Sequence, residues 1–186
     1  MAKVEVDEIG FDAQLLGAMP IVNHFIARLK LDQALETAVP HDDARVLLAP
    51  SSVLGVLVRH LVVEHRPLYE IAEWAAHYAP ELLGLNESGL AALNDDRVGR
   101  TLARLFDADR ASLLTSVVLS MVRAFEIDCT QLHNDSTSIT VTGSHYGGAT
   151  TRGEKPIAEV TFGHSKDHRP DLLTELVASI SPGNHT

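Results

Sequence analysis

The sequence has little of what marks secreted, disulfide-stabilised or membrane-spanning proteins. Its 186 residues include one cysteine, Cys129, so an intramolecular disulfide is impossible and a cysteine-based zinc finger is excluded. No run approaches the roughly 20 apolar residues that a membrane-spanning helix requires. The first residues are too acidic for a signal peptide, and we therefore expect a soluble, cytoplasmic protein.

The chain is also short of positive charge. Its 15 Lys and Arg residues stand against 25 Asp and Glu residues, which gives a formal net charge of −10. The deficit is spread along the chain, because residues 1–126 carry 11 basic and 18 acidic residues and residues 127–186 carry 4 and 7. Nucleic-acid affinity comes largely from neutralising phosphates, so this composition alone argues mildly against DNA binding.

The first two thirds of the chain predict helices, because apolar residues recur there at helical spacing. The expected helices cover residues 15–31, 32–38, 53–63, 68–78, 94–106 and 109–125. Ser51 or Ser52 is the expected N-cap of the third helix, and Asn94 that of the fifth. The run 53–63 is apolar on most faces, so we expect this helix at the centre of a bundle.

A helix-turn-helix is a second interpretation of part of this region, formed by residues 51–65 and 67–78. The second of these helices carries Glu70 and Glu73, which would face the phosphates of docked DNA. Trp74 is expected to point inward. A role of the two helices in packing is therefore preferred over recognition of DNA.

The pattern changes near Ile127, after which β-branched residues and glycines dominate. Strands are expected within residues 131–141, 157–162 and 172–180, with short connections that indicate an antiparallel meander. The glycines of segment 143–153 are interpreted as a hairpin connection, because no helix follows to form a phosphate-binding N-terminus. The expected fold class is α+β, with a helical domain over residues 1–126 and a β domain over residues 127–186. Since no helix covers the meander, this second domain is expected to be cut off.

Ionisable residues gather at two places in the β region. Asp135 lies within an expected strand, where an aspartate is either on a solvated face or placed for function. Residues 164–171 contain six ionisable side chains within eight positions. Three interpretations of this segment are open. It is a solvated turn, a metal site from His164, Asp167 and His168, or a phosphate contact from Lys166 and Arg169.

Five short segments are informative in combination. They are residues 66–69 (RPLY), 93–100 (LNDDRVGR), 105–108 (LFDA), 132–138 (LHNDSTS) and 163–172 (GHSKDHRPDL). The first three resemble the helical N-terminal region of a group of bacterial insertion-sequence transposases. The last two are similar to the start of that group's DDE catalytic domain, which has a ribonuclease-H-like fold. The segments occur in the same order as in the group and extend over nearly the whole chain.

The resemblance implies a two-metal site that acts on DNA at insertion-sequence ends. Asp135 matches the first catalytic aspartate and metal ligand, and Ser136 and Thr137 follow it as in the group, although Asn134 departs from the usual pattern. Three carboxylates of such a site hold two divalent ions, for which oxygen ligands favour Mg²⁺ or Mn²⁺. The matching second Asp and the Glu are expected beyond Thr186. Residues 1–186 alone are therefore expected to be inactive.

The leading hypothesis is thus a truncated transposase. The alternative is a non-catalytic regulator of transposition that occupies DNA ends or pairs with intact transposase, and a homo-oligomer fits either. A third hypothesis is a metal-binding protein that takes up Zn²⁺ through His164 and His168.

Overall fold

The structure, a computed structural model, describes residues 13–41, 47–64, 66–130, 137–140, 151–156 and 175–178. The chain divides into two compact units, Met1–Asp128 and Cys129–Thr186. The described part of the first unit is helical, and that of the second consists of short strands. The expected α+β class is confirmed at this level.

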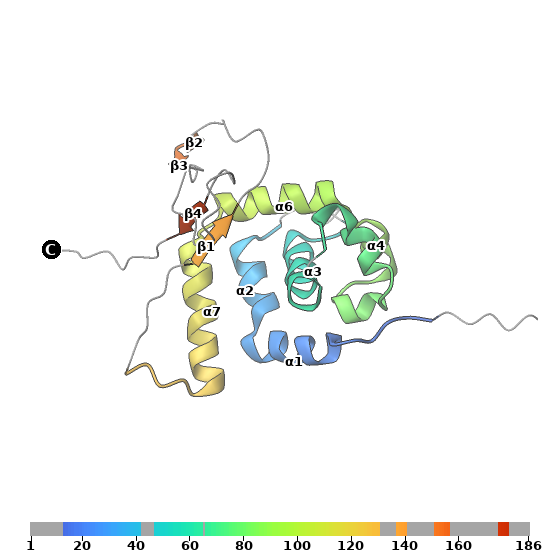
Figure 1. Ribbon diagram of the computed structural model, residues 1–186, viewed down its shortest axis with the longest axis horizontal. Coiled ribbons are helices and arrows are strands. Elements are labelled where there is room, and N and C mark those ends of the chain that lie inside the picture. Colours follow the sequence, from blue (N-terminus) through green and yellow to red (C-terminus); the bar gives the residue numbers. More distant parts are fainter. Residues whose placement is uncertain are drawn as a thin grey trace, which may run out of the picture. The chain divides into compact units, whose positions relative to one another are not determined.

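The helical unit contains α-helices joined by short turns (Figure 1). The helices are α1 (Met19–Leu29), α2 (Leu31–Ala38), α3 (Pro50–Val63), α4 (Ile71–Ala75), α5 (Glu87–Ala91), α6 (Asp95–Asp107) and α7 (Arg110–Phe125). Two 3₁₀ turns, η1 (Leu68–Glu70) and η2 (Pro80–Leu83), precede α4 and α5. The helix predicted over 68–78 is therefore a 3₁₀ turn followed by a five-residue helix, and α5 was not predicted.

Helix α3 lies at the centre of this unit, as its apolar sequence predicts. It packs against α1, α2, α6 and η2, and Figure 1 shows α1, α2 and α6 around it. Val53 and Val56 are completely buried, and Leu54 and Leu57 nearly so. The core around α3 is built from Met19, Leu35, Val39, Leu48, Ile71, Trp74, Ala75, Tyr78, Leu83, Leu93 and Val98.

Of the two N-caps predicted from the sequence, one is confirmed by the structure and the other is wrong. Asn94 caps α6 as predicted, because its side-chain oxygen accepts a 2.8 Å hydrogen bond from the backbone N–H of the third helical residue. The predicted serine cap of α3 is wrong. Ala49 is the N-cap and Pro50 opens the helix, which places Ser51 and Ser52 inside the first turn. Proline is favoured at this first helical position, because its fixed φ suits the helix and the N–H that it lacks would have no partner within the helix.

The described residues of the second unit form two pairs of strands. Strand β1 (Thr137–Thr140) pairs antiparallel with β4 (Glu175–Ala178), and β2 (Thr151–Arg152) pairs with β3 (Lys155–Pro156). Gly153 has a φ of 62° in the turn between β2 and β3, a conformation that glycine adopts without strain.

The pairing of β1 with β4 corrects the predicted strand order. In a three-stranded meander the first and third strands flank the second and run parallel to each other, whereas β1 and β4 are direct antiparallel neighbours. An antiparallel pair needs no fixed length of connection, so the long segment between the two strands permits this arrangement. The expected strand at 157–162 lies outside the described residues.

Candidate functional site

The residues predicted to carry chemistry lie outside the part of the chain that the structure describes. They are Asp135, His164, Lys166, Asp167, His168 and Arg169. Strand β1 begins two residues after Asp135, at Thr137. Among the described residues, no group of three or more His, Cys, Asp or Glu side chains lies close enough to hold a metal ion.

Segment 93–100, one of those that carry the resemblance, forms the start of α6. Leu93 and Val98 are buried in the core, and Asn94 supplies the cap. The Nε atom of Arg97 donates a 2.9 Å hydrogen bond to the carbonyl oxygen of Ala92, just before the helix. These contacts give the segment a role in folding of the helical unit.

The length and packing of the second helix argue against the helix-turn-helix interpretation. Helix α4 has only five residues, and its Ile71, Trp74 and Ala75 are buried. The inward orientation predicted for Trp74 is confirmed, and the helix is too short to lie along a DNA groove while packed in this way.

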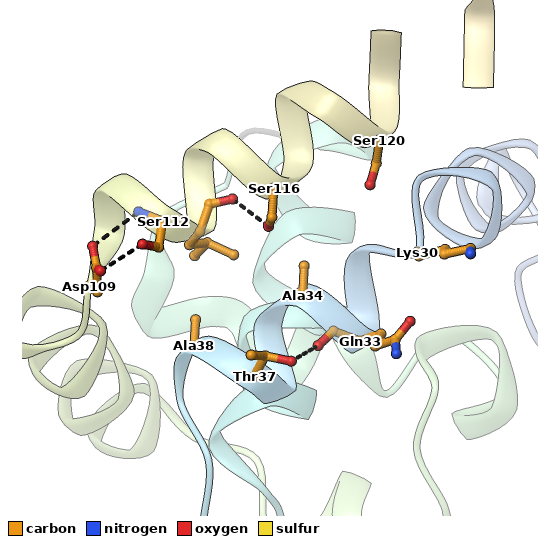
Figure 2. Close-up of a pocket in the computed structure, with 10 residues that line it drawn as sticks. Lys30, Gln33, Ala34, Thr37, Ala38, Asp109, Ser112, Ser116 and Ser120 are labelled. Carbon is orange, nitrogen blue, oxygen red and sulfur yellow. Dashed lines mark hydrogen bonds between the residues drawn. The ribbon is translucent and has the colours of Figure 1, made fainter. Parts of the chain in front are cut away.

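A groove of about 440 Å³ lies between α2 and α7. Figure 2 shows its polar side chains and the two small ones, Ala34 and Ala38. It is lined by Lys30, Gln33, Ala34, Thr37, Ala38, Asp109, Ser112, Leu113, Ser116 and Ser120. The α7 residues that face α2 are thus mainly serines spaced four residues apart.

Three hydroxyl groups of this groove, those of Thr37, Ser112 and Ser116, form hydrogen bonds close to their own positions in the chain. The Thr37 hydroxyl donates to the Gln33 carbonyl oxygen at 2.9 Å, and the Ser116 hydroxyl donates to the Leu113 carbonyl oxygen at 2.8 Å. Asp109 accepts hydrogen bonds from the backbone N–H and the hydroxyl of Ser112 as the N-cap of α7. These three hydroxyl groups therefore help to stabilise the helices that line the groove.

A second pocket, of about 270 Å³, is built around Arg59 of α3. Arg59 is only 5% exposed, and its Nε atom donates a 2.8 Å hydrogen bond to the side-chain oxygen of Asn23. Its Nη1 atom donates to the Gly55 carbonyl oxygen at 2.9 Å and lies 3.9 Å from a carboxylate oxygen of Asp32. Burial lowers the pKa of Arg59, and the charge of Asp32 opposes this shift.

The contacts of Arg59 connect three elements of the helical unit. Asn23 of α1, which accepts from Arg59, donates a 2.8 Å hydrogen bond to the Leu82 carbonyl oxygen in η2. A Cβ atom at Gly55 would lie 3.0 Å from Nη1 of Arg59, so glycine leaves the space that the guanidinium occupies. These contacts make Arg59 a structural residue. This residue was not identified from the sequence. An arginine within the apolar run 53–63 is nevertheless a signal of a buried, partnered charge.

Helix α7 has nearly the bounds that the sequence predicts, but none of its residues is buried. Leu114 is 59% exposed, Val118 40%, Leu119 46% and Met121 39%. Ser112, Ser116 and Ser120 line the groove beside α2, and Leu113 packs against the core.

The described elements define an α-helical unit followed by a small β unit. Residues 11–119 match the model of a protein family described as a domain of unknown function (DUF4277). The match covers more than half of the chain and extends from before α1 into α7, so the chain belongs to this family. Neither a curated protein nor a solved structure matches the chain. None of the helices within the described ranges has the length and apolar character needed to cross a membrane.

Proposed function

We propose that the chain is related to the DDE transposases of bacterial insertion sequences, with a helical N-terminal region followed by the start of a ribonuclease-H-like domain. The observation that carries this proposal is the order of the five matching segments along the chain. The three segments 66–69, 93–100 and 105–108 lie in the helical unit, and 132–138 and 163–172 lie in the second unit. A change from helices to strands between the two groups of segments supports it.

In this proposal Asp135 is the first carboxylate of the catalytic site, and Lys166 and Arg169 contact DNA phosphates. The Mg²⁺ or Mn²⁺ ions of such a site promote cleavage and transfer of a DNA strand. Three carboxylates are needed to hold two ions, and only Asp135 of this chain matches a catalytic carboxylate of the group. Residues 1–186 alone do not fit the metal pair, so the proposed catalytic step requires carboxylates from elsewhere.

We therefore expect purified residues 1–186 to cleave no DNA. The measurement is nicking of a supercoiled plasmid that carries an insertion-sequence end, with Mg²⁺ or Mn²⁺ added, and the matched control is Asp135→Ala. Both proteins are expected to give the background rate. Metal-dependent nicking that Asp135→Ala abolishes would contradict this expectation.

The relationship itself is tested by sequencing the DNA beyond codon 186 and translating it in three frames. Matching Asp and Glu segments in one of these frames would support the transposase proposal. Unrelated sequence in all three frames would count against a catalytic role and would leave a role in binding.

The alternative function is regulation of transposition without catalysis, and the exposed apolar side chains of α7 favour it. A chain that contains the helical unit could pair through this surface with an intact transposase that carries the same unit. Co-purification of the two proteins is the expected result. A monodisperse monomer that leaves the activity of the intact enzyme unchanged would contradict the regulatory role.

A further inference from the structure

We propose that the pocket around Arg59 binds a free α-amino acid, a small ligand that carries both an anionic and a cationic group. The pocket has a volume of about 270 Å³ and lies in the helical unit between α2, α3 and the end of η2. The polar side chains that line it are those of Asp32, Glu36, His41, Ser51, Ser52 and Arg59. The proposal concerns a ligand of the helical unit and does not depend on the DNA chemistry proposed above.

Arg59 offers this pocket a hydrogen-bond donor that no other side chain uses. Arg59 is 5% exposed, and its Nε and Nη1 atoms donate to Asn23 and Gly55. Its Nη2 atom makes no hydrogen bond within the described part of the chain and is not sealed off from solvent, so it is open to the pocket. Charged N–H groups bind carboxylate oxygens more strongly than neutral donors do. The Nη2 atom therefore marks the place of the ligand's carboxylate.

Glycine at position 84 keeps the space beside this atom open. Gly84 is the C-cap of η2 and has a φ of 72°, a conformation that other residues rarely adopt. A Cβ atom at this position would lie 3.6 Å from Nη2 of Arg59, in van der Waals contact with it. The turn after η2 thus leaves one side of the guanidinium uncovered.

The start of α3 supplies further donors to the same pocket. The N-cap Ala49 makes no side-chain hydrogen bond and Pro50 has no N–H, so the N–H groups of Ser51 and Ser52 are left without a cap. The hydroxyls of both serines make no hydrogen bond within the described part of the chain, unlike those of the groove between α2 and α7. The positive end of the α3 dipole also favours an anionic group here.

The carboxylates of α2 exclude a simple anion as the preferred ligand. Asp32 and Glu36 lie one turn apart on α2, so both are on the side of the helix that lines the pocket. An Asp32 oxygen is 3.9 Å from Nη1 of Arg59, too far for a hydrogen bond. With His41 neutral, two carboxylates against one guanidinium give the pocket a net negative charge. A ligand with an ammonium group beside its carboxylate matches both signs of charge.

The volume of the pocket sets the size of the ligand. A water molecule occupies about 30 Å³ in the liquid, so the pocket has room for roughly nine non-hydrogen atoms. Many free α-amino acids are of this size, whereas a nucleotide or a folded peptide is larger. The small apolar part of the lining, from Ala49 and Leu83, is available to the ligand's side chain.

The first test is isothermal titration calorimetry of the full chain with each of the common α-amino acids. At least one of them is expected to bind in a one-to-one complex. Absence of saturable binding for all of them would overturn the proposal.

Two analogues of the amino acid that binds most tightly test the two ends of the ligand. Its primary amide lacks the carboxylate proposed to lie at Arg59, and is expected to bind at least about tenfold more weakly, because a hydrogen bond to a buried charge is lost. The acid that lacks the amino group is expected to bind about fivefold more weakly, since the carboxylates of α2 are exposed. If either analogue bound as tightly as the amino acid, the proposal would be overturned.

The α2 side of the pocket is tested with a variant that removes its charge and keeps its shape. Asp32→Asn combined with Glu36→Gln is expected to weaken binding of the amino acid by about tenfold and to strengthen binding of the acid without the amino group. Glu70→Gln combined with Glu73→Gln is the matched control, because it removes two carboxylates outside the pocket. This control is expected to bind the amino acid as the wild-type chain does.

Circular dichroism checks that both double variants keep their helices, and Arg59 is left unchanged because its contacts also stabilise the helical unit. Equal weakening in the two double variants would overturn the proposal, since it would show an effect of overall charge. Wild-type affinity for the amino acid in the variant of Asp32 and Glu36 would overturn it as well.

Discussion

Replacing Trp74 by alanine is expected to lower the free energy of unfolding of the helical unit by about 3–5 kcal/mol. Trp74 is 1% exposed and lies in the core beside α3. Its ring centroid is 4.8 Å from that of His60, in an edge-to-face arrangement, and 5.1 Å from that of Tyr78. The substitution removes these ring contacts and leaves a cavity that the surrounding helices cannot fill completely.

The lower free energy of unfolding expected for Trp74→Ala comes from lost packing and not from a lost hydrogen bond. The indole Nε1 of Trp74 is buried and makes no hydrogen bond to any residue in the described part of the chain. The measurement is urea denaturation followed by far-UV circular dichroism, which reports on the helical unit and remains usable without the chain's single tryptophan.

Tyr69→Ala is the matched control for Trp74→Ala. Tyr69 is another aromatic residue of the same segment, but it is 71% exposed, and its replacement is expected to change the free energy of unfolding by less than about 0.5 kcal/mol. Similar losses in the two variants would contradict the assignment of Trp74 to the core.

The sequence predicts the centre of the helical unit better than its edge. The apolar run 53–63 has few polar residues on any side, so its burial as α3 follows from composition alone. Asn94 identifies the start of α6, because a side-chain cap is a local interaction. In α1 the buried residues are Met19, Val22 and Ile26, which share one side of the helix. Ile21 is 64% exposed because it lies on another side, so an apolar residue within a helical run is not by itself a core residue.

Helix α7 and the strands show the same difference between local and distant contacts. The bounds of α7 follow from its cap at Asp109 and its apolar pattern, but its orientation depends on α1 and α2, which lie far away in the sequence. The pairing of β1 with β4 likewise depends on residues far apart, and the meander was inferred from the order of the strands alone. The candidate catalytic residues follow from resemblance, and Asp135 stays a prediction.

Replacing Arg59 by leucine is expected to destabilise the helical unit by about 2–3 kcal/mol, whereas Asp32→Asn is expected to cost less than about 1 kcal/mol. The two residues form one ion pair at 3.9 Å, but their surroundings differ. The side chain of Asp32 is 65% exposed, so water screens its charge and removing that charge costs little. Arg59 is buried, and its loss leaves the side-chain oxygen of Asn23 without its 2.8 Å hydrogen bond.

Arg59→Lys separates the charge of this residue from its shape. Lysine keeps the positive charge, but it cannot donate to Asn23 and to the Gly55 carbonyl oxygen with the fixed geometry of a guanidinium, so a loss close to that of Arg59→Leu is expected. All three variants are compared by urea denaturation. If Asp32→Asn cost as much as Arg59→Leu and Arg59→Lys cost nothing, the ion pair would be the stabilising contact. The expected opposite order would show that the hydrogen bonds from α3 through Asn23 of α1 to η2 hold these elements together.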